Sequence, residues 1–186
     1  MTPLLKSLLL VSALLGGLGC HAQTNPAGMP PLQAIPHLDV QRYLGRWVEI
    51  AKFPNRFQKQ CVSSTSANYS LEADGRLRVL NQCKLASGDW ERALGQAKQV
   101  GNSDSARLKV RFAPAWLSFL PFVWGDYWVV DLDESYQLAA VSEPSREYLW
   151  ILSREPVVES AQYAALLSRL KAMGLDITKL EKTDQR

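Results

Sequence analysis

Eight short segments of alternating apolar and polar residues constrain the fold of this chain more than any other feature. Alternation with a period of two is typical of strands that bury one face. Asp74-Gly75 and Glu143-Pro144-Ser145 fit turns between neighbouring segments. No connection has the pattern of the helix that a parallel crossover usually needs. We therefore expect antiparallel neighbours at residues 45–53, 61–71, 76–83, 90–100, 106–112, 126–131, 136–142 and 147–154.

One amphipathic helix follows the last of these segments. Pro156 and Ser160 fit its start, apolar residues recur at helical spacing over 161–173, and Gly174 fits its end. A row of antiparallel strands avoids exposed edges when the sheet closes on itself. The predicted fold class is all-β: an eight-stranded antiparallel up-and-down barrel with a C-terminal α-helix packed outside. Such a barrel holds one small ligand or a packed interior.

The first 37 residues differ from the rest of the chain. Residues 1–19 contain one lysine and a short apolar run, which predicts a secretory signal peptide too short to span a bilayer. Residues 20–37 are rich in proline and predict a flexible tether. Residues 38–186 then form the barrel domain.

Cys20 stands where the signal peptide would be cleaved. Leu18-Gly19-Cys20 resembles the end of a lipoprotein cleavage site, although Gly17 replaces the usual leucine. Cleavage there would leave Cys20 for lipidation, with His21 favouring the bacterial outer membrane as the destination. In the alternative, cleavage after Ala22 gives a periplasmic or secreted protein.

The chain has three cysteines, an odd number for a secreted protein. Lipidation of Cys20 would leave Cys61 and Cys83 to form one disulfide in an oxidising compartment. The alternative is two buried free thiols. Counting from the Asp74-Gly75 turn places the two cysteines out of register, so a disulfide would need a bulge or bend at the start of the second segment.

Three separated motifs resemble those of the lipocalin family, specifically the bacterial outer-membrane lipoprotein type, with apolipoprotein D more distant. They are Gly45-Arg46-Trp47, Leu132-Asp133-Glu134-Ser135-Tyr136, and Arg154 at the end of the eighth segment. The resemblance covers about residues 38–180. It implies that Arg154 lies across the Trp47 ring at the closed base, where a cation attracts the ring face. Gly45 would allow the close approach, and Asp133 and Tyr136 would lie at the same end.

The alternation also predicts which side chains face the interior. Charged residues of the third and fifth segments should face solvent, which turns their apolar neighbours inward. The lining would be apolar, with a few hydroxyls and one indole N–H. It suits an acyl chain, since each buried methylene contributes about 0.8 kcal/mol. Alternatively, these side chains simply fill the core. The predicted ligand-binding residues are Ala67, Tyr69, Val79, Val110, Phe112, Tyr148 and Trp150.

The connection at residues 113–124 is unusually apolar for a loop. It could be a flap over the barrel mouth, a lip that contacts a membrane, or a surface buried in a dimer. The sequence leaves all three interpretations open.

No catalytic pattern is visible in the sequence. Both histidines, His21 and His37, precede the barrel, metal-ligand spacing is absent, and there is no glycine-rich phosphate loop. The formal charge of +3 without a dense basic run argues against nucleic acid. The prediction is a non-enzymatic protein, without metal or cofactor, that stores or carries a lysophospholipid, fatty acid or similar lipid at the bacterial outer membrane.

Two alternatives remain open. One is an isomerase-like enzyme that uses a free Cys61 at the mouth. The other is an interaction protein that docks through residues 113–124, with a second copy of the chain as one candidate partner.

Overall fold

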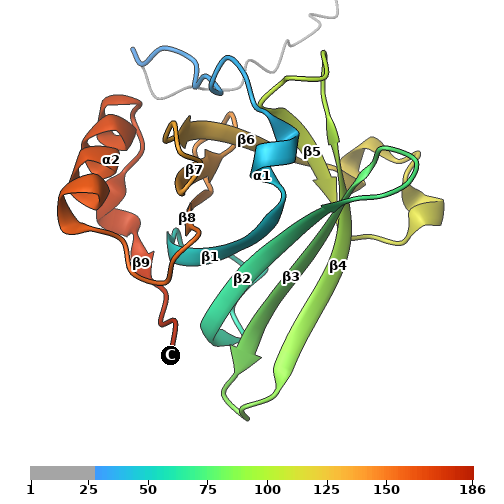
Figure 1. The fold of residues 1–186 in the computed structure, drawn as a ribbon, viewed down its shortest axis with the longest axis horizontal. Coiled ribbons are helices and arrows are strands. Elements are labelled where there is room, and N and C mark those ends of the chain that lie inside the picture. The colour runs from blue at the N-terminus through green and yellow to red at the C-terminus, as the bar shows by residue number, and fades with distance from the viewer. Residues whose placement is uncertain (1–27) are drawn as a thin grey trace, which may run out of the picture.

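The strands of the computed structural model, which describes residues 28–186, close into an antiparallel barrel (Figure 1). Each strand pairs with its sequence neighbour, and β1 pairs with both β8 and β2, which closes the sheet. The barrel prediction is confirmed, with strand ends that differ by up to two residues. The eight strands are β1 (Gly45–Lys52), β2 (Cys61–Leu71), β3 (Leu77–Leu85), β4 (Trp90–Gln99), β5 (Arg107–Arg111), β6 (Gly125–Leu132), β7 (Leu138–Ser142) and β8 (Leu149–Ser153).

The barrel has a closed end and an open end. The short helix α1 (Val40–Tyr43) lies at the closed end, together with the β2–β3, β4–β5 and β6–β7 turns. The open end carries the β1–β2 loop (53–60), the β3–β4 turn, the segment 112–124 and the β7–β8 turn (143–148). In Figure 1 the β2–β3–β4 sheet flares away from the rest of the barrel toward the β3–β4 turn.

The predicted C-terminal helix is α2 (Ser160–Ala172). It covers the outer side of the β6, β7, β8 and β1 stack (Figure 1), with Leu166 and Leu170 fully buried against it. The Arg169 guanidinium donates two hydrogen bonds to Asp131 of β6, at 2.6 and 2.8 Å. The N-cap is Glu159, whose carboxylate accepts from the N–H groups of Ala161 and Gln162, and not the predicted Ser160.

Alternation divides the apolar residues into two cores. Trp47, Leu108, Val129, Val141 and Leu152 belong to a cluster inside the barrel. On β6, β7 and β8 the neighbouring residues Val130, Ala140 and Ile151 belong to a second cluster between the outer wall and α2. The sheet is therefore buried on both faces along β6–β8, which explains why those strands have small, apolar residues on both sides.

The expectation of a flexible tether through residue 37 is wrong for its last part. Leu32 is buried in the outer core, and the Ile35 N–H donates to the Val129 carbonyl at 2.8 Å. Arg146 of the β7–β8 turn donates to the Pro30 carbonyl at 2.7 Å. Residues 28–38 therefore form a strap that runs along the barrel from the open end to the closed end. The predicted signal peptide and Cys20 lie outside the described residues.

The chain's last strand was not predicted from the sequence. After the short helix η3 (Ile177–Lys179), β9 (Glu181–Lys182) pairs antiparallel with Ala51 and Lys52, at the end of β1 that is nearest the open end. Beyond it, Gln185 donates to the carbonyls of Glu49 on β1 and Thr65 on β2, at 2.6 and 3.0 Å. The C-terminal residues therefore close the gap where β1 and β2 separate toward the open end.

Candidate functional site

Arg154 and Trp47 form the floor of the barrel. The Arg154 guanidinium lies 3.9 Å from the centroid of the Trp47 ring, and that ring is fully buried. Its nitrogens also donate to the carbonyls of Arg46 and Arg42, both at 2.8 Å, and of Tyr136 at 3.3 Å. One side chain thus ties α1, β1 and the β6–β7 turn to the end of β8.

Gly45 and Asp133 support this floor from either side. Gly45 has φ +92°, a conformation that side chains disfavour, and a Cβ there would contact the Arg154 guanidinium. Asp133 lies in the β6–β7 turn at the same end of the barrel. Its carboxylate accepts the N–H groups of Gln137 and Leu138 at 2.6 Å and so shapes the β6–β7 turn. Burial raises the pKa of Asp133, but hydrogen bonds from Ser135 and these N–H groups lower it overall.

The predicted ligand-binding residues divide by depth. Ala67, Tyr69 and Val79 are buried in the half near the floor. Val110 and Trp150 belong to the same inner wall but are only partly buried. The inner wall is therefore tightly packed at its base and incompletely filled above it.

The open end exposes its inner surface. Glu91 and Ala93 lie on the same inner face of β4 as Gly95 and Ala97. Unlike those two residues, Glu91 and Ala93 are exposed. Phe112 packs on Gly95 from the facing strand and is 43% exposed, so it lies on the rim and not in the depth of the barrel.

Three tyrosine hydroxyls meet inside the barrel. The Tyr127 hydroxyl lies 2.9 Å from that of Tyr43 and 2.7 Å from that of Tyr69. Burial raises the pKa of Tyr69 to about 12 and raises those of the other two well above their ordinary value, so all three are neutral at physiological pH. The two hydrogen bonds use two of the three hydroxyl hydrogens, so the third remains free to donate to another group.

An acceptor lies on the same wall. Asn81 of β3 is opposite Ala67 in the register, and its side-chain oxygen is buried without a hydrogen-bond partner among the described residues. Such a group costs free energy unless something donates to it. The interior therefore offers one free donor and one free acceptor in an apolar wall.

Side chains of the β1–β2 loop reach into the open end. The Trp150 indole donates to Gln58 at 2.8 Å, and Gln58 donates in turn to the Glu49 carboxylate at 2.6 Å. The Tyr148 ring lies between the rings of Trp150 and Phe57, with centroids 5.8 and 5.5 Å away. This loop thus partly covers the mouth and holds Trp150 in position.

Sequence reasoning missed Glu49, Tyr43, Tyr127 and Gln58. Glu49 shares the alternation of Trp47, so a carboxylate at an inward strand position was an available signal. Tyr127 follows from the same counting on β6, since it lies opposite inward-facing Leu108. Gln58 and Tyr43 lie on a loop and a short helix, where alternation gives no direction.

Glu49 is a buried carboxylate that a pH experiment can detect. It accepts from Gln58 and Thr183, both at 2.6 Å, and burial raises its pKa above the ordinary 4.5 despite those hydrogen bonds. Folding therefore takes up a proton at pH values between 4.5 and the raised native pKa, and the wild-type protein gains stability as the pH falls through that window.

We expect Glu49→Gln to raise the melting temperature at pH 7, because its amide oxygen can accept from Gln58 and its N–H can donate to the Thr183 hydroxyl, without a buried charge. This gain should shrink as the pH is lowered toward 4.5. Thermal denaturation of both proteins from pH 4.5 to 8 measures it. A gain that is constant with pH would contradict the buried-charge explanation.

Cys61 and Cys83 form a disulfide at the open end, with Cα atoms 5.5 Å apart. The register between β2 and β3 shifts twice between Cys61 and Ser66, which supplies the bulge that the sequence required. The enzyme alternative needed Cys61 as a free thiol, and this bond removes that nucleophile.

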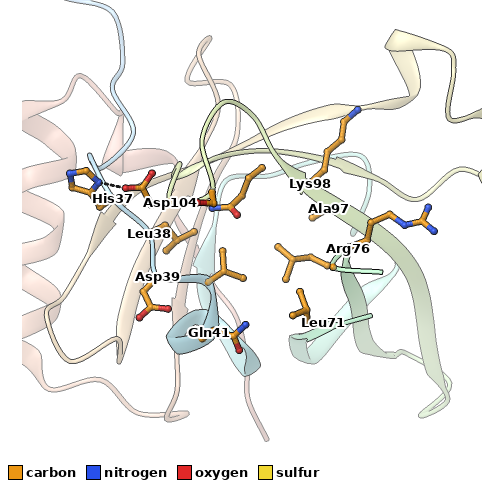
Figure 2. Close-up of a pocket in the computed structure, with 14 residues that line it drawn as sticks. His37, Leu38, Asp39, Gln41, Leu71, Arg76, Ala97, Lys98 and Asp104 are labelled. Carbon is orange, nitrogen blue, oxygen red and sulfur yellow. Dashed lines mark hydrogen bonds and ion pairs between the residues drawn. The ribbon is translucent and has the colours of Figure 1, made fainter. Parts of the chain in front are cut away.

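A separate pocket of about 580 Å³ lies at the closed end (Figure 2). Its floor is apolar, from Leu38, Leu77 and Ala97, and it opens between α1 and the β2–β3 and β4–β5 turns. The charged ends of Arg76 and Lys98 point away from it in Figure 2. His37, on the strap, is paired with Asp104 at 2.7 Å. The pocket therefore presents no charged group to a ligand beyond this pair and the N-cap Asp39.

Two features are absent from the described part of the chain, residues 28–186. It contains no group of three or more His, Cys, Asp or Glu side chains arranged to hold a metal ion. No helix in it is long and apolar enough to cross a membrane.

Comparison with known proteins gives consistent matches over the barrel. Residues 38–185 match the family model described as a lipocalin-like domain. The chain is 44% identical to temperature-induced lipocalin-1 of Arabidopsis thaliana, over 83% of each protein. It is 37% identical to outer membrane lipoprotein Blc of Escherichia coli, over 86% of this chain and 85% of Blc. Insecticyanin of the tobacco hornworm has a similar structure, with a TM-score of 0.66 at 20% identity over 86% and 87% of the chains.

Proposed function

Because the chain belongs to the lipocalin family, we propose that it binds and carries one small hydrophobic ligand inside its barrel. The observation that carries this proposal is the contrast within the inner wall. Side chains near the floor are buried, whereas Val110, Tyr127 and Trp150 are only partly buried and Ala93 is exposed on the same face. An apolar chain entering from the open end would cover these surfaces, and burial of apolar surface favours binding by about 25 cal/mol per Å².

We infer a lipid with a polar oxygen as the ligand class, a fatty acid or lysophospholipid. The tyrosine cluster can donate one hydrogen bond, which a carboxylate, ester or phosphate oxygen can accept. Asn81 can accept one, which a hydroxyl can donate. Trp150 and Tyr148 provide flat apolar surfaces nearer the mouth. A pure hydrocarbon would use the wall and leave both polar groups unpaired.

The direct test is mass spectrometry of lipids extracted from protein purified from its native source. The proposal expects one stoichiometric lipid class that is absent from a control purification. It fails if no lipid is carried and a fluorescent fatty acid does not bind with saturation to the delipidated protein.

Removing the three hydroxyls tests the polar part of the site. We expect Tyr43→Phe/Tyr69→Phe/Tyr127→Phe to weaken binding of hexadecanoic acid by about tenfold, because a hydrogen bond to a charged group contributes about 1.5–3 kcal/mol. Binding of the hydrocarbon probe diphenylhexatriene should not change. Competition fluorescence measures both affinities.

The matched control is Tyr163→Phe on α2, outside the barrel, which should leave both affinities unchanged. Equal loss for the acid and the hydrocarbon in the triple variant would show that the hydroxyls shape the wall and do not contact the polar group.

For location, we propose acylation at Cys20 and attachment to the bacterial outer membrane. The Leu18-Gly19-Cys20 pattern supports it, as does the similarity to outer membrane lipoprotein Blc. The plant relative shows that the family is not confined to that location. Labelling of cells with radioactive palmitate should mark the wild-type protein and not a Cys20→Ala variant. Equal labelling or no labelling of both would reject the anchor.

A further inference from the structure

The segment between β5 and β6 exposes its largest side chains. Residues 113–124 contain no charged residue, and Trp116, Phe119 and Phe122 are 72%, 75% and 79% exposed. These rings are not packed against the inner wall, so their exposure favours the membrane and dimer interpretations over a flap across the mouth. In Figure 1 the segment, in yellow, projects from the side of the barrel opposite α2.

The segment is held firmly against the outer wall. The Trp124 ring lies between Lys98 and Arg111, at 4.3 and 5.2 Å, and both cations belong to the outer faces of β4 and β5. Arg111 is only 4% exposed. It donates to Gln96 at 2.7 Å and to the Ala113 carbonyl at the start of the segment. The three exposed rings are therefore presented from a fixed base.

The backbone of the segment pairs part of its N–H groups internally. It folds into the short helices η1 (Ala115–Leu117) and η2 (Pro121–Val123). Turn hydrogen bonds of 3.0 to 3.3 Å use the N–H groups of Leu117, Ser118, Leu120, Val123 and Trp124, and the Trp124 indole donates to the Ser118 carbonyl. Backbone that enters an apolar medium must pair its polar groups internally, and these bonds meet part of that requirement.

These properties select a bilayer over a protein as the occupant. Trp and Phe side chains favour the membrane interface. The segment offers them without charge at the tip, and the exposed cation Lys98 lies directly behind, where lipid phosphates would be. A protein partner would need polar groups at the rim to set its register, and the tip presents none besides Ser118.

The chain's N-terminal part leaves the structure at the same end. Pro30 is bonded to Arg146 in the β7–β8 turn, which lies at the open end with the segment. If Cys20 is acylated, as proposed above, the eight residues to Gly28 can span at most about 28 Å. Such an anchor would keep the open end near the membrane. The geometry of the segment itself does not depend on this anchor.

We propose that Trp116, Phe119 and Phe122 insert into the interfacial layer of a lipid bilayer and hold the open end of the barrel against it. A lipid ligand could then pass between bilayer and barrel without crossing water.

The test uses the full chain with Cys20→Ala in every protein, so that acylation does not contribute. Trp116→Ser/Phe119→Ser/Phe122→Ser is compared with the parent for partition onto vesicles of phosphatidylethanolamine and phosphatidylglycerol. The matched control, Leu71→Ser/Val100→Ser/Val157→Ser, removes three exposed apolar side chains elsewhere, of which Leu71 and Val100 lie at the closed end. We expect at least a tenfold lower partition coefficient for the first variant and no change for the control.

A dye attached to Phe119→Cys reports the contact directly. Cys20 is replaced and Cys61 and Cys83 are bonded to each other, so the dye reacts with the new thiol. Its emission should shift to the blue on vesicles, whereas the same dye on Val100→Cys should not shift. Equal partition of both triple variants, or a water-like dye on vesicles, would overturn the proposal. A parent dimer that only the aromatic variant dissociates, without a change in partition, would assign the surface to a second copy and also overturn it.

Failure of the proposal that the segment inserts into a bilayer is distinguishable from failure of the proposal that the barrel binds a lipid. The affinity for free hexadecanoic acid in solution should be the same in the parent and the aromatic variant, because Trp116, Phe119 and Phe122 lie outside the inner wall.

Discussion

Replacing Trp47 by alanine is expected to lower the free energy of unfolding by about 3–5 kcal/mol, the cost of removing a large buried aromatic side chain. The ring is fully buried in the inner core, and its indole donates to the Tyr43 carbonyl at 2.8 Å. The substitution removes the surface over which the Arg154 guanidinium lies. Urea denaturation followed by circular dichroism measures the change.

Two further variants separate ring burial from other effects of losing a tryptophan. Trp116→Ala removes an exposed ring and should change stability by less than about 0.5 kcal/mol. Arg154→Lys keeps the charge but loses the planar fork that reaches three carbonyls, so it should be less stable than wild type and more stable than the Trp47 variant. Equal stability of wild type and Trp47→Ala would show that the floor does not support the barrel.

Removing the disulfide is the second large change. Cys61→Ala/Cys83→Ala is expected to lower the free energy of unfolding by about 3 kcal/mol, since the bond closes a loop with a sequence separation of 22 residues. The same loss should appear when the wild-type protein is unfolded with a reducing agent present. Cys20→Ala, measured in parallel, should have no effect on the unfolding of the barrel.

The disulfide variant should also bind ligand less tightly. The bond fixes the start of β2, directly after the loop that carries Gln58 to Trp150 and Glu49. Without it, the loop has more conformations and the mouth is less organised. Ligand affinity that is unchanged at a temperature where the variant is fully folded would show that the loop holds its position without the bond.

The sequence predicted the barrel well because each strand has a local signal. Asp74-Gly75 positions one hairpin, and alternating charge on β5 shows which face is outward. The arginine that stacks on Trp47 was identified through the resemblance to lipocalins, since the two residues are 107 positions apart and no local pattern joins them.

Alternation predicted the direction of the Arg111 and Phe112 side chains but not how deeply they are buried. It placed Arg111 outward, which is correct, but could not show that Trp124 and Gln96 bury it. It placed Phe112 inward, where it faces Gly95, yet on the rim that position is still exposed. The face of the sheet to which a side chain points is a local property of the strand. Burial of that side chain depends on which distant segment packs over it.

The polar groups of the site show the same limit. Tyr43, Tyr69 and Tyr127 come from a helix and two strands that meet only in the closed barrel. The C-terminal Thr183 and Gln185 reach Glu49 across more than 130 residues. These contacts carry no spacing that a sequence could reveal.

By itself, then, the sequence determined the strand order, the inward and outward faces, and the helix that follows, because side-chain alternation and turn residues act over a few positions. Only the tertiary structure decided where the polar groups meet, that the strap and C-terminal residues close the wall, and that the apolar segment faces outward. Those outcomes depend on closure of the sheet, which brings together residues whose separation along the chain sets no preference for contact.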